Sequence, residues 1–356
     1  MTSPTSILSE AVERLFVDLT AAVHSTADAS PARYQQHWAA VEELGIPKTL
    51  VPEVADGFGG SWLDAFVVCH LVGLHALPLP VGEALVGRWL LAVAHLELPD
   101  GGVTLGTCPH PQFAHDPLSG APTFSGELPA TPWGAESAYV VVACAHPDGE
   151  RLVVLASADA TCSEVETTLA GEPRSHLRFT AAPLVTSGAL PDAGVLLTNG
   201  GALLRTAQIS GALEAILALC VAHVKDRVQF GKPLGAFQAI QHQLALLAEE
   251  VAAVKCAAQA AFRAAALGDA AFELAAAKLR ANRAITQATS IAHQVHGAMG
   301  FTMEHRLHRF TQRLWTWRSE YGNDRYWADI LGRSVLANGA DRLWSNLTSR
   351  GDRGHG

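Results

Sequence analysis

The sequence has no excess of basic residues and no closely spaced cysteines. Its 25 lysines and arginines are outnumbered by 34 acidic residues, for a formal net charge of −9. Because nucleic-acid-binding proteins usually present a basic face, this balance argues against a nucleic-acid partner. The six cysteines are widely scattered and form no CxxC pair, which favours buried reduced thiols over disulfides or a zinc site.

Long apolar runs are also missing. No segment offers about 20 uninterrupted apolar residues, and the N-terminus lacks a basic region followed by an apolar one. We therefore expect no targeting signal, no membrane span and a cytoplasmic location. The 49% share of hydrophobic residues instead indicates a globular protein with a large core, and 356 residues are enough for two or three packed units.

The residue pattern changes twice along the chain. Residues 1–102 are mainly helical in pattern, with Gly and Pro between the apolar runs. Residues 103–198 contain short β-rich segments separated by turn residues, and residues 199–356 are alanine-rich with long helical runs. We predict an α+β multidomain fold with an N-terminal helical domain, a middle antiparallel β-barrel or sandwich, and a C-terminal four-helix bundle.

Two segments of the third region combine polar side chains with glycine turns. Arg227 begins a stretch in which Gly231 and Gly235 would let backbone N–H groups approach a ligand. Its planar, permanently charged guanidinium suits a pyrophosphate, whereas the competing interpretation is a helix cap paired with an acidic neighbour. Further on, Gly297 and Gly300 follow a long helix and predict a sharp, exposed turn.

With the helical–β–helical order, these segments resemble the acyl-CoA dehydrogenase family of flavoproteins. The resemblance is carried by RVQFGKPL at 227–234 and by QVHGAMGF at 294–301. It implies that both segments contact the flavin adenine dinucleotide (FAD) of a neighbouring subunit, and that one tryptophan of the middle region lies beside the flavin. The expected FAD-binding residues are Arg227, Phe230, Gln238, Gln294, Gly297, Gly300 and Trp133.

The same resemblance implies a reaction. A glutamate removes the α-proton of an acyl-CoA thioester while the β-hydride passes to flavin N5, and an electron-transfer flavoprotein accepts the electrons. Relatives supply this carboxylate from a Tyr-Glu-Gly-Thr turn, or from the helix before the RxxFG motif. Here Glu320 lies one position early, before Tyr321-Gly322, and Leu204 precedes the matching Arg205.

Glu320 is therefore the candidate base and Arg205 a candidate substrate contact. The competing interpretation pairs Glu320 with Arg318, Arg325 or another exposed cation. The middle region departs from the family pattern as well, because Thr107-Cys108 stands where relatives carry Thr-Glu.

The ending RLWTWRSEYGNDRYW, at 313–327, is similar to subunits of actinobacterial α2β2 acyl-CoA dehydrogenases that degrade sterols. This similarity implies a bulky, for example steroid-derived, acyl-CoA substrate and a homo- or heterotetramer with a paralogous subunit. The alternative is a catalytically silent partner that completes the FAD site of an active paralogue.

The 16 histidines raise the question of a metal site. His305 and His308 have the i, i+3 spacing of one helical face, but no second cluster supplies further ligands. We predict no bound metal and assign these histidines to the solvated surface or to an interface.

Overall fold

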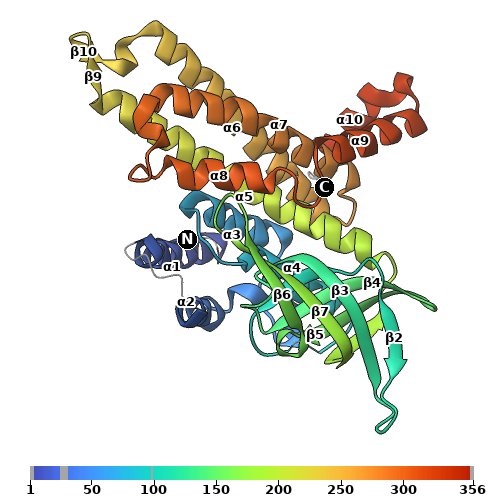
Figure 1. The fold of residues 1–356 in the computed structure, drawn as a ribbon. Helices are drawn as coiled ribbons and strands as arrows, with labels where there is room; N and C mark the ends of the chain where they lie inside the picture. Colours follow the sequence, from blue (N-terminus) through green and yellow to red (C-terminus); the bar gives the residue numbers. More distant parts are fainter. Residues whose placement is uncertain (1–3, 25–30, 98, 353–356) are drawn as a thin grey trace.

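The computed structural model describes residues 4–24, 31–97 and 99–352 and confirms the helical–β–helical order (Figure 1). The described residues of the N-terminal domain contain four α-helices. They are α1 (Pro4–His24), α2 (Pro31–Glu43), α3 (Trp62–His75) and α4 (Val81–Val93), with the 3-10 turns η1 (Ile46–Lys48) and η2 (Glu53–Ala55) between α2 and α3. Helix α3 starts with a capping box, in which the Ser61 and Asp64 side chains each accept a hydrogen bond from the other residue's backbone N–H.

The middle domain is a sandwich of two four-stranded sheets, ordered β1-β4-β5-β8 and β2-β3-β7-β6. The strands are β1 (Val103–Thr107), β2 (Gln112–His115), β3 (Pro122–Pro132), β4 (Tyr139–His146), β5 (Gly149–Ala156), β6 (Thr161–Thr167), β7 (Pro173–Pro183) and β8 (Thr186–Ala189), with η3 (Ser157–Asp159) before β6. Every pair is antiparallel except β1 with β4. These two strands run the same way because the chain crosses to the other sheet between them, through β2 and β3.

The sequence of strand β4 is a continuous apolar run because both faces of the strand are buried. Val140 and Val142 belong to the core between the two sheets, whereas Val141 and Ala143 belong to the core shared with the helices. The strand is thus buried on both faces, as strands covered by helices usually are. At Gly87 of α4 an added Cβ would lie 2.9 Å from the Val103 side chain, so this glycine lets the helix pack closely on the sheet.

The C-terminal domain is a helical bundle with a small hairpin at one end. Its elements are α5 (Ala193–Asp226), β9 (Val228–Gln229), β10 (Lys232–Pro233), η4 (Leu234–Ala236), α6 (Gln238–Ala266), α7 (Ala271–His296), η5 (Gly297–Phe301), α8 (Leu307–Trp317), α9 (Asp324–Asn338), η6 (Ala340–Arg342) and α10 (Leu343–Asp352). Helix α5 begins at Ala193, ahead of residue 199, where the sequence placed the start of the bundle. Figure 1 shows the β9–β10 hairpin at the opposite end of the bundle from α10.

Helix α5 connects all three domains. It is the one helix among the described residues that is long and apolar enough to cross a membrane, but its most apolar window is 61% buried, which is typical of a core helix. It packs against α3, α4, α6, α7 and α8. At the α3 crossing, a Cβ added at Gly73 or Gly211 would lie 1.9 Å from a backbone oxygen of the other helix, so both glycines are needed for this contact.

Candidate functional site

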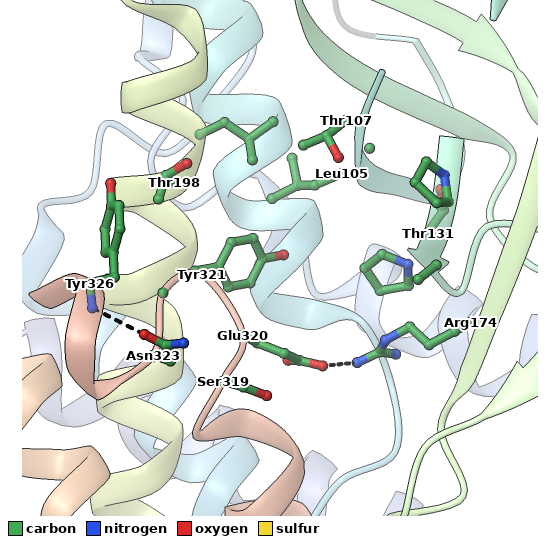
Figure 2. Close-up of a pocket in the computed structure, with 16 residues that line it drawn as sticks. Leu105, Thr107, Thr131, Arg174, Thr198, Ser319, Glu320, Tyr321, Asn323 and Tyr326 are labelled. Atoms are coloured by element: carbon green, nitrogen blue, oxygen red, sulfur yellow. Dashed lines mark hydrogen bonds and ion pairs between the residues drawn. The ribbon is translucent and has the colours of Figure 1, made fainter. Parts of the chain in front are cut away.

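A cavity of about 560 Å³ lies between the middle domain and the C-terminal helices (Figure 2). Its walls come from β1, β3, β7 and α5, and from the loop of residues 318–323 between α8 and α9. Thr107, Thr131, Arg174, Thr198 and Glu320 are among its polar lining residues. The cavity therefore brings the candidate base to the boundary between two domains.

The 318–323 loop is held by tight local packing. Tyr321 (φ 51°) and Gly322 (φ 104°) adopt the left-handed conformation that turns the chain sharply. The Tyr321 ring lies on Gly201 of α5, where an added Cβ would be 2.3 Å from it, and the Tyr321 carbonyl accepts a hydrogen bond from Trp327 Nε1 at 3.1 Å. This packing leaves Glu320 at the cavity, with its carboxylate toward Arg174 (Figure 2).

The Glu320 carboxylate is bound by two arginines from different domains. One oxygen accepts a hydrogen bond from Arg174 of β7, and the other accepts one from Arg205 Nε of α5 at 2.6 Å. Arg205 also donates to Glu83 of α4 and to Gln208. A single buried guanidinium thus joins the N-terminal helices to the loop.

These contacts continue on the other side of Arg174. Its Nη2 atom lies 3.9 Å from Glu172, whose other oxygen accepts a 3.1 Å hydrogen bond from Arg313 Nε of α8. We call the resulting set of alternating charges the buried ion-pair chain; in order it consists of Glu83, Arg205, Glu320, Arg174, Glu172 and Arg313. Each negative group has a positive neighbour, so the charges balance within the fold.

The ion-pair chain controls the protonation of Glu320. Burial by itself would raise the pKa of this carboxyl, but the charges of Arg205 and Arg174 outweigh burial and hold its pKa below the ordinary value. Burial would likewise lower the pKa of Arg205, yet Glu320 and Glu83 raise it. A carboxylate that is ionised and bonded through both oxygens to guanidinium groups is a weak proton acceptor.

The RVQFGKPL segment forms an exposed turn after α5. Arg227 is the C-cap residue of α5, and its carbonyl accepts a hydrogen bond from Leu234 N at 2.9 Å, which closes the turn. Phe230 has φ 53° and is 90% exposed, and Gln238 is the exposed first residue of α6. The arginine, the phenylalanine and the glutamine therefore all point to surface positions at the hairpin end of the bundle.

The QVHGAMGF segment forms the end of α7 and the turn η5. Gly297 has φ 58° and no neighbour within 4 Å of an added Cβ, so the glycine is needed for the backbone conformation alone. Gly300 is buried, and its added Cβ would lie 2.9 Å from His296 Cβ. A second hollow, of about 680 Å³, is lined by Thr286, Thr289, Ser290, His293, Gln294, Gly297, Phe301 and Trp315.

The predicted residues are therefore separated into two groups, and Trp133 belongs to neither. Only Glu320 lines the first cavity, and Arg205 lies behind it in the buried ion-pair chain. Trp133 is not among the residues that line either cavity, because its ring stacks on Tyr34 of α2 with centroids 5.4 Å apart. The second group faces outward and consists of Arg227, Phe230, Gln238, Gln294 and Gly297, whereas Gly300 is buried within η5.

Sequence reasoning missed the true partners of Glu320. Of the partners it proposed, Arg318 binds Asp324 instead, at 2.6 Å. The partner from the middle domain, Arg174, is 146 positions away along the chain, and no local pattern marks it.

The histidines and cysteines form no metal site in the part of the chain that the structure describes, where no group of three or more His, Cys, Asp or Glu side chains could hold an ion. His308 Nδ1 lies 2.7 Å from the His305 carbonyl oxygen, and the His305 ring packs 4.6 Å from that of His296. Cys162 and Cys256 are exposed, so the expectation of uniformly buried thiols was wrong for these two.

The fold has known counterparts. Residues 197–336 match the family model described as acyl-CoA dehydrogenase, C-terminal domain. One solved structure of similar fold is that of the Tcur3481–Tcur3483 steroid ACAD, with a TM-score of 0.80 and 23% identity. Another is that of the ChsE4–ChsE5 complex from Mycobacterium tuberculosis, with a TM-score of 0.81 and 20% identity. Each match covers 95% of this chain and 98% of the chain in the solved structure. The three-part architecture is thus the acyl-CoA dehydrogenase fold, as the sequence predicted.

A curated relative extends the match beyond the C-terminal domain. Acyl-CoA dehydrogenase IpdE2 of Mycolicibacterium smegmatis is 28% identical over 278 residues, which cover 76% of this chain and 78% of the relative. The chain is thus similar to acyl-CoA dehydrogenases over about three quarters of its length.

Proposed function

We propose that this chain is one subunit of an FAD-dependent enzyme that dehydrogenates an acyl-CoA thioester between Cα and Cβ. In this proposal the chain completes the FAD site of a paralogous subunit, and that subunit supplies the base. The observation that carries the proposal is the binding of the Glu320 carboxylate by Arg174 and Arg205. Members of the family typically bind FAD, and one solved structure of similar fold is a complex of two different chains, ChsE4 and ChsE5.

The outward-facing residues fit a dinucleotide held by a neighbour. Arg227 offers an exposed fork for a pyrophosphate, and Phe230 offers an exposed aromatic face. Gln294 and Gly297 line a hollow in which backbone and amide groups are open to a ligand. Bound FAD would supply the acceptor for the β-hydride, while these side chains would bind and orient it.

Three features support a silent role for the chain's own cavity. Glu320 would have to leave two arginines before it could take a proton. Thr107-Cys108 lacks the carboxylate of the family's Thr-Glu-Pro segment, and Trp133 stacks on Tyr34 away from the cavity.

A self-sufficient enzyme is the second candidate, because Glu320 does line the cavity and would lie near a molecule bound there. In this version a bound thioester would have to rearrange the buried ion-pair chain, freeing the carboxylate to remove the α-proton. Arg205 would then lie behind the substrate and steady the freed loop.

The substrate class and the assembly rest on the relatives. We propose a bulky acyl-CoA, such as a steroid-derived thioester, because one structure of similar fold is named a steroid ACAD. We further propose an electron-transfer flavoprotein as the electron acceptor, a tetramer with a paralogous subunit, and a cytoplasmic location.

The test compares the chain alone with the chain co-expressed with acyl-CoA dehydrogenase paralogues from its own genome. Flavin absorbance and anaerobic reduction of the flavin by a steroid acyl-CoA are measured for each. We expect bound, reducible FAD only in the co-expressed assembly. There Glu320→Gln should leave the reduction rate unchanged, as should the control Glu127→Gln, an exposed carboxylate of β3.

Two results would contradict the proposal. One is flavin reduction by the chain alone. The other is a loss of reduction rate of about 100-fold or more in the Glu320→Gln assembly, which is the effect of removing a general base. Either result would favour the self-sufficient enzyme.

A further inference from the structure

Three histidine rings meet at the hairpin end of the bundle. The buried His296, at the end of α7, contacts His223 of α5 and His305 of the segment before α8. Its ring centroid is 4.5 Å from that of His223 and 4.6 Å from that of His305. We call these three rings the imidazole cluster. Through it, side chains of α5 and α7 and of the segment before α8 are in direct contact.

The cluster lies beside both glycine-turn segments. His223 is in the last turn of α5, just before Arg227, and His296 is itself part of QVHGAMGF. One turn earlier on α7, His293 stacks on Phe301 with ring centroids 4.4 Å apart and so holds the other end of the same segment. The cluster therefore fixes how the RVQFGKPL segment sits against the QVHGAMGF segment.

The contacts of His296 suit a neutral ring. Its Nδ1 atom lies 2.8 Å from the Ala292 carbonyl oxygen, which can only accept, so Nδ1 carries the proton. The Cys220 thiol, 4.0 Å from Nδ1, is uncharged because burial raises its pKa to about 12. The Nε2 atom of His296 is buried and has no hydrogen-bond partner among the residues that the structure describes. A second proton there would be a buried donor without a protein acceptor, which costs free energy.

Groups at the end of α5 influence the proton affinity of His223. Burial lowers its pKa, and the other two rings of the cluster and Arg227 lower it further. Asp226 acts in the opposite direction, but the pKa stays below the ordinary value of 6.5. In the fold, His223 therefore binds a proton less tightly than a solvated imidazole does.

The other side of the cluster disfavours protons as well. Burial lowers the pKa of His305, and the His296 ring lowers it further. Arg306 and His308, from the segment before α8 and from α8, act in the same direction. Burial and His296 also lower the pKa of His293. Proton uptake is thus disfavoured by groups on α5, on α7 and on α8.

We propose that the imidazole cluster is an acid-sensitive contact: neutral rings hold the RVQFGKPL and QVHGAMGF segments together, and protonated rings release them. The ring contacts and the Nε2 atom of His296 carry this proposal, and its functional meaning rests on the proposed binding of FAD across the subunit boundary. Both segments lose their fixed arrangement in acid, so FAD binds less tightly there.

Proton linkage gives the direction of the effect. In the open arrangement the histidines are solvated and their pKa returns to about 6.5, whereas in the closed contact the pKa values of His223 and His305 are lower. The open arrangement therefore binds more protons below pH 6.5, and closure is lost progressively as the pH falls through the folded pKa values. Well above pH 6.5 both arrangements are neutral, and closure does not depend on pH.

Amide hydrogen exchange on the purified full-length chain tests the proposal. After correction for the intrinsic exchange rate, protection of a peptide spanning 292–302 should fall about threefold or more between about pH 7.5 and 5.5, because each proton taken up on opening changes the equilibrium by up to about tenfold per pH unit. Glu320 does not contribute in this range, since its pKa lies below 4.5. A peptide spanning 247–254 of α6 should keep its protection throughout.

His296→Phe keeps an aromatic ring in the cluster but cannot take up a proton. Its peptide 292–302 should depend less on pH, and NMR titration should show higher pKa values for His223 and His305 than in the wild type, because a neighbouring cation no longer opposes their protonation. His242→Phe, at an exposed histidine of α6, is the matched control and should keep the wild-type profile.

The wild-type profile decides even if His296→Phe does not fold. Protection of peptide 292–302 that stays constant down to about pH 5.5, or that rises in acid, would overturn the proposal. So would an unchanged pH dependence in a folded His296→Phe variant.

Flavin titration of the co-expressed assembly gives the functional readout. The dissociation constant for FAD should rise about threefold or more between about pH 7.5 and 5.5 in the wild type and in His242→Phe, and less in His296→Phe. Tighter FAD binding in acid would mean that the histidines bind the pyrophosphate as cations, and would overturn the proposal. An assembly that binds no FAD at any pH would contradict the proposed function, whereas the exchange profile, measured without flavin or partner, would still decide on the contact.

Discussion

The cavity and the hairpin end of the bundle both contain arginines, but the fold treats their charges in opposite ways. Around the cavity each arginine of the buried ion-pair chain contacts a glutamate. These ion pairs link α4, α5, β7, α8 and the 318–323 loop. At the hairpin, Arg227 is an exposed residue at the end of α5, next to an exposed Phe230. A charge that is paired within the fold is not available to a ligand, whereas an exposed one can bind a ligand.

This difference predicts different consequences of mutation. Removing one member of a buried ion pair leaves a charge without its partner in a poorly solvated place, so the cost appears in stability. Removing an exposed cation costs the fold little and affects only what the cation binds. The two regions can therefore be separated by measuring stability and flavin binding on the same variants.

The largest effect should come from Arg205→Met. This change leaves both Glu83 and Glu320 without the guanidinium that they share, and should lower the free energy of unfolding by about 3 to 5 kcal/mol in urea titrations. The control is Arg178→Met, whose pair with Glu127 is exposed and should be worth about 1 kcal/mol or less. Equal stability of the two variants would mean that the buried ion-pair chain does not hold the domains together.

Arg227→Ala should have the opposite profile. In the co-expressed assembly it should weaken FAD binding by about 10- to 100-fold, because a charge-assisted hydrogen bond contributes about 1.5 to 3 kcal/mol. The unfolding free energy of the isolated chain should be unchanged, since Arg227 is exposed. Flavin titration followed by absorbance gives the dissociation constant.

The control for this prediction is Lys225→Ala, two residues earlier on the last turn of α5 and also exposed. It removes a positive charge from the same end of the helix without removing the fork. Unchanged FAD binding in Arg227→Ala, or an equal loss in both variants, would contradict a specific contact with the pyrophosphate.

The contrast between the two regions also explains what the sequence could predict. The RVQFGKPL and QVHGAMGF segments are continuous along the chain, and their turns depend on local backbone conformation, as φ 58° at Gly297 shows. Helix periodicity and the change to short β segments likewise revealed the three-part order. The parallel β1–β4 pair was missed, because it depends on how distant elements pack.

The buried ion-pair chain could not be predicted. Its hydrogen bonds from Arg205 and Arg174 to Glu320 join residues 115 and 146 positions apart, and the bond from Arg205 to Glu83 spans 122 positions. The sequence could show that Glu320 lies one residue from the family's usual position, but not that two arginines from other domains meet it. A carboxylate's role depends on these neighbours, so the candidate base was named without its most important property.

The smallest effect expected from breaking the ion-pair chain is the acid dependence of stability. The pKa of Glu320 in the fold lies below its ordinary value of 4.5, so its ionised form stabilises the fold at higher pH, and this contribution is lost as the pH falls through the folded pKa. Glu320→Gln cannot ionise and should therefore lose less stability in acid than the wild type does. Urea unfolding at a series of pH values below 6 should show the free-energy difference between the two proteins shrinking as the pH falls. A constant difference over this range would mean that Arg174 and Arg205 do not stabilise the charged carboxylate, and Glu320 would again be a plausible proton acceptor.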